Sequence, residues 1–460
     1  MSIKKHLLAL ALSACVTIPA WAQESLIDVY RRAVENDPAV REAEATFRAN
    51  SETKAQTRSL FLPTLNASAN LSNQYSDSRG GVELPGGAVV GGDRNITDAD
   101  ASRWSLQLTQ TLFDWGNFAQ LRQADKVVAR AETTYRAATQ DLMLRVATRY
   151  FDVLAAEDNL ASAVARRESV SRQLEQSQRR FEVGLIAITD VQQSQAGYDD
   201  ANAAEIEAQR AVATAYEFLR EIIGELVDDL ASPTDELPLL SPDPTNAEQW
   251  VQTALQQNLA LVTSRLATEI ALDDIDIQRS NRLPTLSLSA GYSEGTNERS
   301  STSYTNGVAT QGFPSTTRPD GRQWSLDVRF PIFTGGLNQS RIRQSVYNHQ
   351  AAEQALERIA RQTERQTRDA YLGVISEISR VRALRQSVES NRTALRATEA
   401  GFEVGTQTTV DVLRAQELLS QAETTYSRSR YDYIRNTLLL KQAAGTLSEA
   451  DIQQVDSWLQ

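Results

Sequence analysis

The sequence has almost none of the residues that supply thiol, imidazole or metal chemistry. Its 460 residues include one cysteine, Cys15, and two histidines, His6 and His349. A Cys/His zinc site needs several such ligands, and a Ser-His-Asp relay would have to use His349, which lies in a polar helical stretch. No Gly-rich Walker loop followed by Lys-Ser or Lys-Thr occurs, and the net charge of −12 disfavours nucleic-acid binding. The composition therefore predicts no enzyme activity, no cofactor, no metal and no nucleic-acid partner.

The sequence also lacks a long apolar run after its first segment, which excludes an α-helical membrane span. Residues 1–22 have the features of a secretory signal peptide. Lys4 and Lys5 precede an apolar stretch, and Ala20-Trp21-Ala22 supplies small residues at the cleavage site. A second interpretation is cleavage within Leu12-Ser13-Ala14-Cys15, which would leave Cys15 as a lipid-bearing N-terminus. Either signal predicts an exported protein.

The remaining sequence consists of two similar halves. Leu62-Pro63-Thr64-Leu65 recurs as Leu283-Pro284-Thr285-Leu286, and Phe181-Glu182-Val183-Gly184 recurs as Phe402-Glu403-Val404-Gly405. A repeat of this length indicates one architecture that has been duplicated. The predicted organisation is a first structural repeat, a Pro-rich linker or equatorial region, a second structural repeat and a C-terminal equatorial segment, at residues 23–231, 232–246, 247–447 and 448–460.

Each half contains two segments in which apolar and polar residues alternate strictly, which predicts half-buried β-strands. The four predicted strands are at about 63–76, 103–113, 284–293 and 323–333. The segments between them, 77–101 and 293–322, are rich in Gly, Ser, Thr and Asn and are predicted to be long polar loops. The same alternation is compatible with a soluble antiparallel sheet, but the signal peptide and the Trp and Tyr near strand ends favour a lipid-facing band. The predicted lipid-facing residues are Leu65, Leu71, Trp104, Leu106, Leu108, Leu286, Leu288, Trp324, Leu326, Val328 and Phe330.

The rest of each half is predicted to be helical. Long helices at about 115–181 and 336–402 carry heptad-spaced apolar residues, which is typical of coiled coils. Shorter helices are predicted at about 190–223 and 411–444. Gly184 and Gly405 are predicted to end the long helices in the left-handed conformation, and Thr189-Asp190 and Asp411 to cap the next ones.

Four strands per chain are too few to close a barrel, which needs about eight. Open sheet edges cannot face lipid, because unpaired backbone groups cost several kcal/mol each there. The sequence therefore predicts a ring of identical chains, with three chains giving twelve strands and the helices forming a second, α-helical cylinder.

Several motifs resemble the TolC family of outer-membrane channel proteins, and the resemblance covers nearly the whole chain from Glu24 to Leu447. They are Ser105-Leu106-Gln107-Leu108-Thr109-Gln110-Thr111-Leu112-Phe113-Asp114, Ala187-Ile188-Thr189-Asp190-Val191, Val404-Gly405-Thr406 and Val410-Asp411-Val412-Leu413. The resemblance implies a mixed α/β membrane protein with two internal repeats. It would form a homotrimer with a twelve-stranded β-barrel in the outer membrane of a Gram-negative bacterium, continued by a long α-helical barrel in the periplasm.

The resemblance also implies a function and its partners. Members of the family are passive exit ducts of tripartite efflux pumps and type I secretion systems. They dock with a periplasmic membrane-fusion adaptor and an inner-membrane pump of the RND, MFS or ABC type. The turns Val183-Gly184-Leu185 and Val404-Gly405-Thr406 are similar to the family turns that meet the adaptor. The cargo and the identity of the pump are not predicted.

Residues of the family's periplasmic gate can be matched to this sequence, and several are altered. Asp411 matches the first of two aspartates in an acidic ring, and Arg414 stands where the second would be. Thr189-Asp190 matches the partners of the hydrogen bonds that close the gate. The facing Tyr and Arg are replaced by Phe402 and Gln407. The resemblance thus implies a closed state with fewer polar links and a weaker acidic ring.

Two other classes of protein are compatible with parts of the pattern. A secreted trimeric coiled-coil protein, such as an adhesin stalk, would explain the heptads but not the alternating strands or the duplication. A periplasmic adaptor would explain the helical hairpins, but it would form no pore.

Overall fold

The computed structural model describes most of the chain, namely residues 23–87, 89–227, 229–234, 237–305 and 307–459. The predicted signal peptide, including Cys15, lies outside the described residues. The chain divides into two compact units, which we call the helical unit and the sheet unit. The helical unit comprises residues 23–44, 135–261 and 360–459, and the sheet unit comprises residues 45–134 and 262–359.

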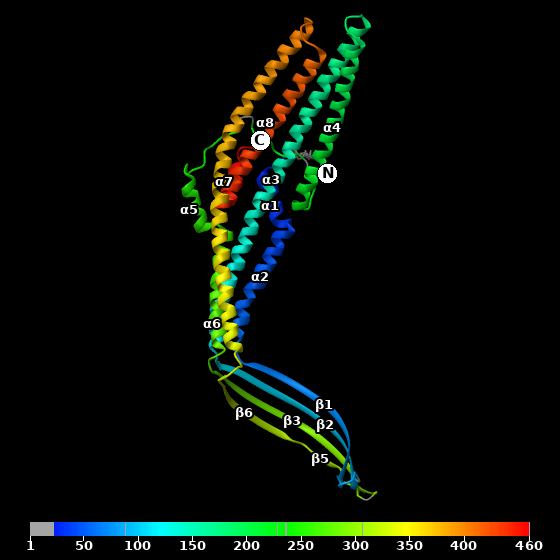
Figure 1. Ribbon diagram of the computed structural model, residues 1–460, viewed down its shortest axis with the longest axis vertical. Coiled ribbons are helices and arrows are strands. Elements are labelled where there is room, and N and C mark those ends of the chain that lie inside the picture. Colours follow the sequence, from blue (N-terminus) through cyan, green and yellow to red (C-terminus); the bar gives the residue numbers. More distant parts are fainter. Residues whose placement is uncertain (1–22, 88, 228, 235–236, 306, 460) are drawn as a thin grey trace, which may run out of the picture. The chain divides into compact units, whose positions relative to one another are not determined.

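Nine helices are present in the described residues, and two pairs of them form long hairpins in the helical unit (Figure 1). In each pair a very long helix, α3 or α7, is followed after a short turn by α4 or α8. The predicted starts of α4 and α8, at 190 and 411, were two residues too late. The bounds are α1 Leu26–Asn36, α2 Pro38–Ser59, α3 Trp115–Glu182, α4 Ile188–Ile223, α5 Ala247–Gln257, α6 Leu259–Ser280, α7 Leu337–Glu403, α8 Thr409–Ala444 and α9 Glu449–Asp456.

The core of the helical unit is built where α1 and α9 pack beside the hairpins. Val146 and Val153 on α3, one heptad apart, are buried there. Phe151 stacks on Tyr431 of α8 with ring centroids 5.6 Å apart. The Tyr150 hydroxyl donates to Ala231 O at 2.7 Å, and burial raises the pKa of this phenol. A buried phenol needs such a partner, so this bond fixes the segment that follows α4 against α3.

Both ends of the described chain are tied to that segment. Glu24 N donates to Asp229 O at 3.0 Å, and Ala231 N donates to Glu24 O at 3.1 Å. Near the other end, Thr234 N donates to Trp458 O at 3.1 Å. Residues 229–234 therefore hold the beginning of the first repeat and the end of the second.

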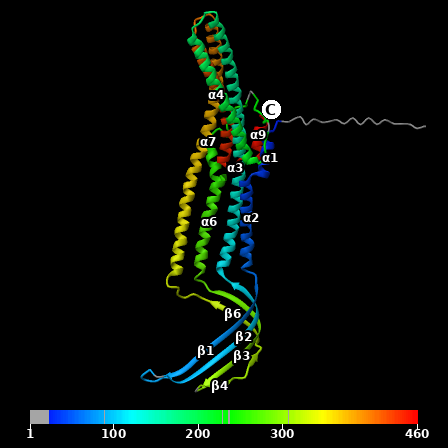
Figure 2. The ribbon, with the colours of Figure 1, turned by 90° about the vertical axis from the view of Figure 1, so that its right-hand side faces the viewer.

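The sheet unit contains one antiparallel sheet in which β1, β2, β3 and β6 lie side by side in that order (Figure 2). β4 and β5 pair with the far end of β3, where they continue the ladder that β6 makes with it. The bounds are β1 Thr64–Glu83, β2 Val89–Phe113, β3 Thr285–Thr305, β4 Val308–Gln311, β5 Ser315–Thr317 and β6 Asp320–Arg329.

The prediction of long polar loops at 77–101 and 293–322 was wrong for most of these residues, because the strands continue through them. Polar side chains hid this continuation from a pattern search that relies on apolar alternation. Arg94 and Asp77, for example, form two hydrogen bonds of 2.8 and 2.7 Å across the β1–β2 ladder. The end of the last strand was also misplaced. β6 stops at Arg329, and Phe330 lies beyond it, before Pro331, whose nitrogen cannot donate to a ladder.

Among the helices of the described residues, none combines the length and the apolar character that crossing a bilayer would need.

Candidate functional site

The turns that end α3 and α7 have the same backbone geometry. Gly184 and Gly405 have φ angles of 75° and 79°, so both are in the left-handed region, as predicted. Leu185 N donates to Arg180 O at 2.8 Å, and Thr406 N donates to Gly401 O at 2.8 Å. Each turn is a Schellman motif, in which the glycine adopts a conformation that costs other residues strain. We call residues 181–190 and 402–411 the first tip and the second tip.

The two helices that leave the tips begin differently. At the start of α8, Asp411 N donates to Thr408 Oγ1 at 3.3 Å and Thr408 N donates to Asp411 Oδ2 at 2.9 Å, which completes a capping box. At the start of α4, Ala187 N donates to Asp190 Oδ2 at 3.3 Å, but the methyl group of Ala187 accepts nothing in return. Both aspartates supply N-capping chemistry, as predicted, and they do so from the third position of their helices, where each accepts a hydrogen bond from the backbone N–H of the cap residue.

The carboxylate of Asp411 is directed to its own helix end. Hydrogen bonds from the Thr408 hydroxyl and backbone lower the pKa of Asp411, and the charge of Arg414 adds to this effect. In the described part of the chain no ion pair shorter than 4.0 Å joins Arg414 to Asp411, and both side chains are exposed. Asp411 therefore carries its negative charge at neutral pH and presents it at the tip.

Phe402 connects the two hairpins within one chain. The Arg180 guanidinium, at the end of α3, lies 4.7 Å from the centroid of the Phe402 ring, and its Nη1 donates to Phe402 O at 3.5 Å. The ring is 7% exposed, whereas its counterpart in the first repeat, Phe181, is 41% exposed. A cation over a desolvated ring is worth up to about 2 kcal/mol. Arg180 was not among the predicted gate residues, because its partner is 222 positions away in sequence.

Gln407, in the turn between α7 and α8, packs back onto the end of α7. A Cβ atom added at Gly401 would lie 2.7 Å from Gln407 Cγ, so the side chain occupies the space that this glycine leaves open. The sequence analysis did not identify Gly401 as part of this site. A glycine inside a helix costs about 1 kcal/mol relative to alanine and often marks such a contact. Thr189, the second residue of α4, is exposed.

Apolar side chains project from both tips into solvent. Val183, Leu185 and Val404 are 70%, 72% and 77% exposed. Exposed apolar groups gathered at one end of a protein mark an interaction surface. The tips thus combine hydrogen-bonded left-handed turns, a negative charge and exposed apolar side chains.

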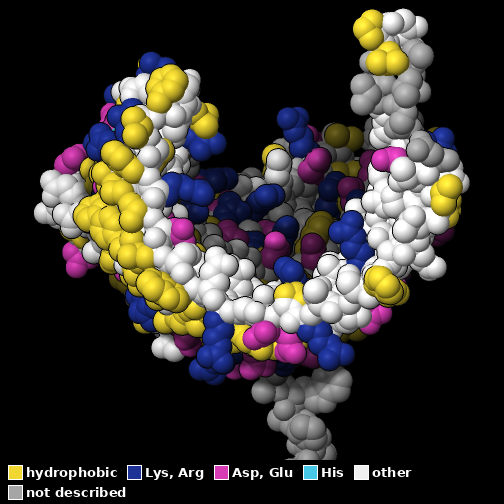
Figure 3. All heavy atoms as spheres, turned by 90° about the horizontal axis from the view of Figure 1, so that it is seen from below, with side chains coloured by type: hydrophobic (Ala, Val, Ile, Leu, Met, Phe, Trp, Pro, Cys, Tyr) yellow, Lys and Arg dark blue, Asp and Glu magenta, His cyan; other side chains and the backbone are white. Residues whose placement is uncertain are grey.

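The second candidate surface is one face of the sheet. The register places Leu65, Leu108, Ala290 and Trp324 in one row across four strands. Together with the neighbouring rows it forms what we call the apolar face, and Figure 3 shows such side chains gathered in a continuous band along one side of the surface. The other predicted lipid-facing strand residues are on the same face, namely Leu71, Trp104, Leu106, Leu286, Leu288, Leu326 and Val328.

The opposite face, which we call the polar face, carries the intervening residues. One of its rows is Asn66, Gln107, Gly291 and Gln323. The part of the sheet nearest the helices therefore has one apolar side and one hydrophilic side, whose side chains suit lipid and water respectively.

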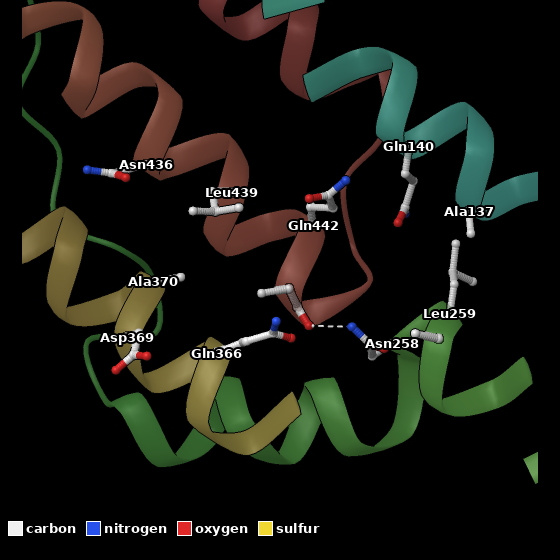
Figure 4. A pocket seen from close by; sticks show the side chains of 12 residues that line it. Ala137, Gln140, Asn258, Leu259, Gln366, Asp369, Ala370, Asn436, Leu439 and Gln442 are labelled. Atoms are coloured by element: carbon white, nitrogen blue, oxygen red, sulfur yellow. Dashed lines mark hydrogen bonds between the residues drawn. The ribbon is translucent and has the colours of Figure 1, made fainter. Parts of the chain in front are cut away.

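A cavity of about 450 Å³ in the helical unit lies among α3, α7, α8 and the start of α6 (Figure 4). Its polar lining consists mainly of amides, including Gln140, Gln366 and Gln442. Asn258 Nδ2 donates to Ala443 O at 2.9 Å across its edge, and Asp369 is paired with Arg365 at 2.7 Å. This set contains no nucleophile beside a base, and it lies away from both tips along the helices.

Comparison with known proteins relates the chain to outer-membrane export proteins. The sequence model of the family described as "Outer membrane efflux protein" matches residues 29–225 and again residues 250–446. The chain is 36% identical to outer membrane protein TolC of Vibrio cholerae over 99% of both chains. It is 28% identical to alkaline protease secretion protein AprF of Pseudomonas aeruginosa, over 94% of this chain and 86% of that one. The crystal structure of outer membrane protein VceC from Vibrio cholerae has the same fold, with a TM-score of 0.71 and 17% identity over 91% of this chain and 96% of that one.

Proposed function

Because this chain belongs to the family of outer membrane efflux proteins, we propose that it is the exit duct of a tripartite efflux pump or a type I secretion system. The protein is located in the outer membrane, and its helical part lies in the periplasm. The similarity to a TolC protein over the full length supports efflux, and the similarity to a protease secretion protein supports secretion.

The single observation that carries this proposal is an apolar face on a sheet with two open edges. Among the described residues, β1 pairs along one edge with β2, and β6 pairs along one edge with β3. In lipid, each unpaired backbone group on the free edges would cost several kcal/mol. We propose that neighbouring copies satisfy these edges. A homotrimer then gives twelve strands, counting β4 to β6 as one interrupted strand, with the apolar face turned to outer-membrane lipid.

The tips are the proposed docking and gating region. Val183, Gly184, Leu185, Val404, Gly405 and Thr406 would meet the helical hairpin of a periplasmic membrane-fusion adaptor. Asp411 would form a ring of three carboxylates at the narrowest point, where charge biases the passage of ions. Thr189 and Asp190 would lie beside it. An inner-membrane pump of the RND, MFS or ABC type would supply the energy, since a passive duct performs no chemical step.

The alternative of a secreted coiled-coil stalk accounts for α3, α4, α7 and α8 but gives the apolar face nothing to contact. An isolated stalk with such a face would expose a continuous apolar surface to water, which soluble proteins avoid. The duct gives both the helices and the sheet a role.

The proposal is tested with the full chain, purified from outer membranes in detergent and reconstituted in planar bilayers. We expect a trimer that dissociates on heating and conducts ions. Leu326→Arg, on the apolar face, should prevent assembly, because an arginine facing lipid costs about 2–4 kcal/mol at mid-depth. Gln323→Arg, on the polar face of the same strand, is the matched control and should assemble normally. A wild-type sample that is a water-soluble monomer without conductance would contradict the proposal.

A further inference from the structure

The carboxylates of the sheet are divided unequally between its two faces, whereas the arginines are divided equally, with Arg79, Arg94 and Arg322 on the apolar face. The register places six described carboxylates on the apolar face, toward its far end, namely Asp77, Asp98, Asp100, Glu294, Glu298 and Asp320. In the same strands the polar face has two described carboxylates, Asp93 and Asp327, and three arginines, Arg103, Arg299 and Arg329. The chain has a net charge of −12, so a face with more arginines than carboxylates departs from the composition.

Two of these arginines have neutral surroundings. Arg103 pairs across the ladders with Asn70 and Gly295, and Arg299 pairs with Ala99 and Ser315. No ion pair joins Arg103 or Arg299 to any other described residue, and both are exposed.

The remaining charges of the polar face lie near its ends. Arg329 and Asp327 are two residues apart on the same face of β6, next to the helices, so their charges offset each other. Asp93 is near the β1–β2 turn, and along β2 it is six residues from Ala99, the ladder partner of Arg299, which is about 20 Å at 3.4 Å per residue. The middle of the polar face therefore carries two positive charges and no compensating carboxylate.

We propose that this face makes the outer-membrane part of the duct attractive to anions, in contrast to the acidic tip. The inference rests on the proposed function, since closure of the sheet is what turns the polar face inward. In a trimer, Arg103 and Arg299 form two rings of three guanidinium groups, about 14 Å apart along the strands. Guanidinium groups bind carboxylates, sulfonates and phosphates through paired hydrogen bonds. The rings therefore favour small anionic cargo and anionic groups on larger cargo at the exit.

The test is the reversal potential of single channels in a KCl gradient, measured for the wild type and the double variant Arg103→Gln/Arg299→Gln. With a Debye length of about 10 Å near 0.1 M salt, the cation-over-anion permeability ratio should rise about twofold on neutralisation. Near 1 M salt the Debye length is about 3 Å, and the difference should disappear. Arg103→Lys/Arg299→Lys keeps the charges and should retain the wild-type ratio.

Arg322→Gln is the matched control, because Arg322 pairs with Tyr292 on the apolar face of the same sheet. It should leave the ratio unchanged. An unchanged ratio in conducting double-variant channels would overturn the inference while leaving the duct intact, and so would an equal shift in Arg322→Gln. If the wild-type chain forms no channels, the proposed function itself fails.

Discussion

The two tips show how duplicated sequences with the same backbone can acquire different roles. Both end their long helix in a Schellman motif around a left-handed glycine. The side chains around these turns differ. Within the described residues of one chain, Phe402 is buried under Arg180, whereas no cation lies over the exposed ring of the equivalent Phe181; the position equivalent to Arg180 in the second repeat is Gly401.

The helices that follow the two turns also differ in how their first residues are capped. Thr408 and Asp411 form both hydrogen bonds of a capping box. At α4 only the bond from Ala187 N to Asp190 is present, because alanine has no side-chain acceptor. The helix that leaves the second tip thus begins with one capping hydrogen bond more than the helix that leaves the first. The two repeats therefore share the backbone of the turn and differ in the side chains around it.

The largest effect is expected from breaking what the tips share. Gly184→Val combined with Gly405→Val places β-branched residues at φ angles of 75° and 79°, although a Cβ atom there would meet nothing within 4 Å. The left-handed conformation costs about 1–2 kcal/mol per residue, and more for a β-branched one, so both turns should rearrange. We expect trimers to assemble but dye export to be lost in a host without its own channel.

The control for this pair is Gly184→Asn with Gly405→Asn, since asparagine tolerates the left-handed region best after glycine. Export should be largely retained in that variant. Normal export in the valine pair would remove the claim that the turns dock with the adaptor.

An intermediate effect is expected from the side chain that distinguishes the tips. Phe402→Ala removes a buried ring, which costs about 3–5 kcal/mol in packed sites, and it removes the partner of Arg180. The equivalent Phe181→Ala changes an exposed residue and should cost within about 0.5 kcal/mol. We expect Phe402→Ala to raise the leak conductance in planar bilayers and Phe181→Ala to leave it unchanged.

Arg180→Gln removes the cation but keeps the buried Phe402 ring, so it distinguishes the contribution of the cation from that of the ring. We expect it to raise the leak conductance less than Phe402→Ala does. Equal conductance in the Phe402→Ala and Phe181→Ala channels would show that the Arg180–Phe402 contact does not hold the tips.

The smallest effect is expected from exchanging the helix starts. Thr408→Ala should destabilise the first turn of α8 by about 1 kcal/mol, and Ala187→Thr should stabilise that of α4 by a similar amount. Hydrogen exchange of the backbone amides in residues 409–412 and 188–191 measures both changes. Faster exchange in the first variant and slower exchange in the second would make the tips alike, whereas no change would mean that the boxes do not govern local order.

Features that depend on local sequence could be predicted, and those that depend on distant partners could not. The left-handed glycines and the long helices follow from backbone preferences and heptads. Alternation of apolar and polar residues correctly predicted which apolar strand residues share one face of the sheet. Phe330 is the exception, because β6 ends at Arg329, before Pro331. The outer halves of the strands were missed because their ladders join polar residues, such as Arg94 and Asp77, whose pairing no alternation shows. The contact between Arg180 and Phe402 joins the two repeats, and neither residue carries a local sign of it.

The short segment 229–234 has a consequence for how the chain tolerates change. It is hydrogen-bonded to Glu24 near one end of the described chain and to Trp458 near the other. The segment that connects the two repeats therefore also holds both of these ends. A protease cut or an insertion in this segment would release both ends together, whereas trimming the last residues would release one. An affinity tag at the C-terminus is therefore best separated from the fold by a flexible spacer, and this connecting stretch is an unsuitable place for an insertion.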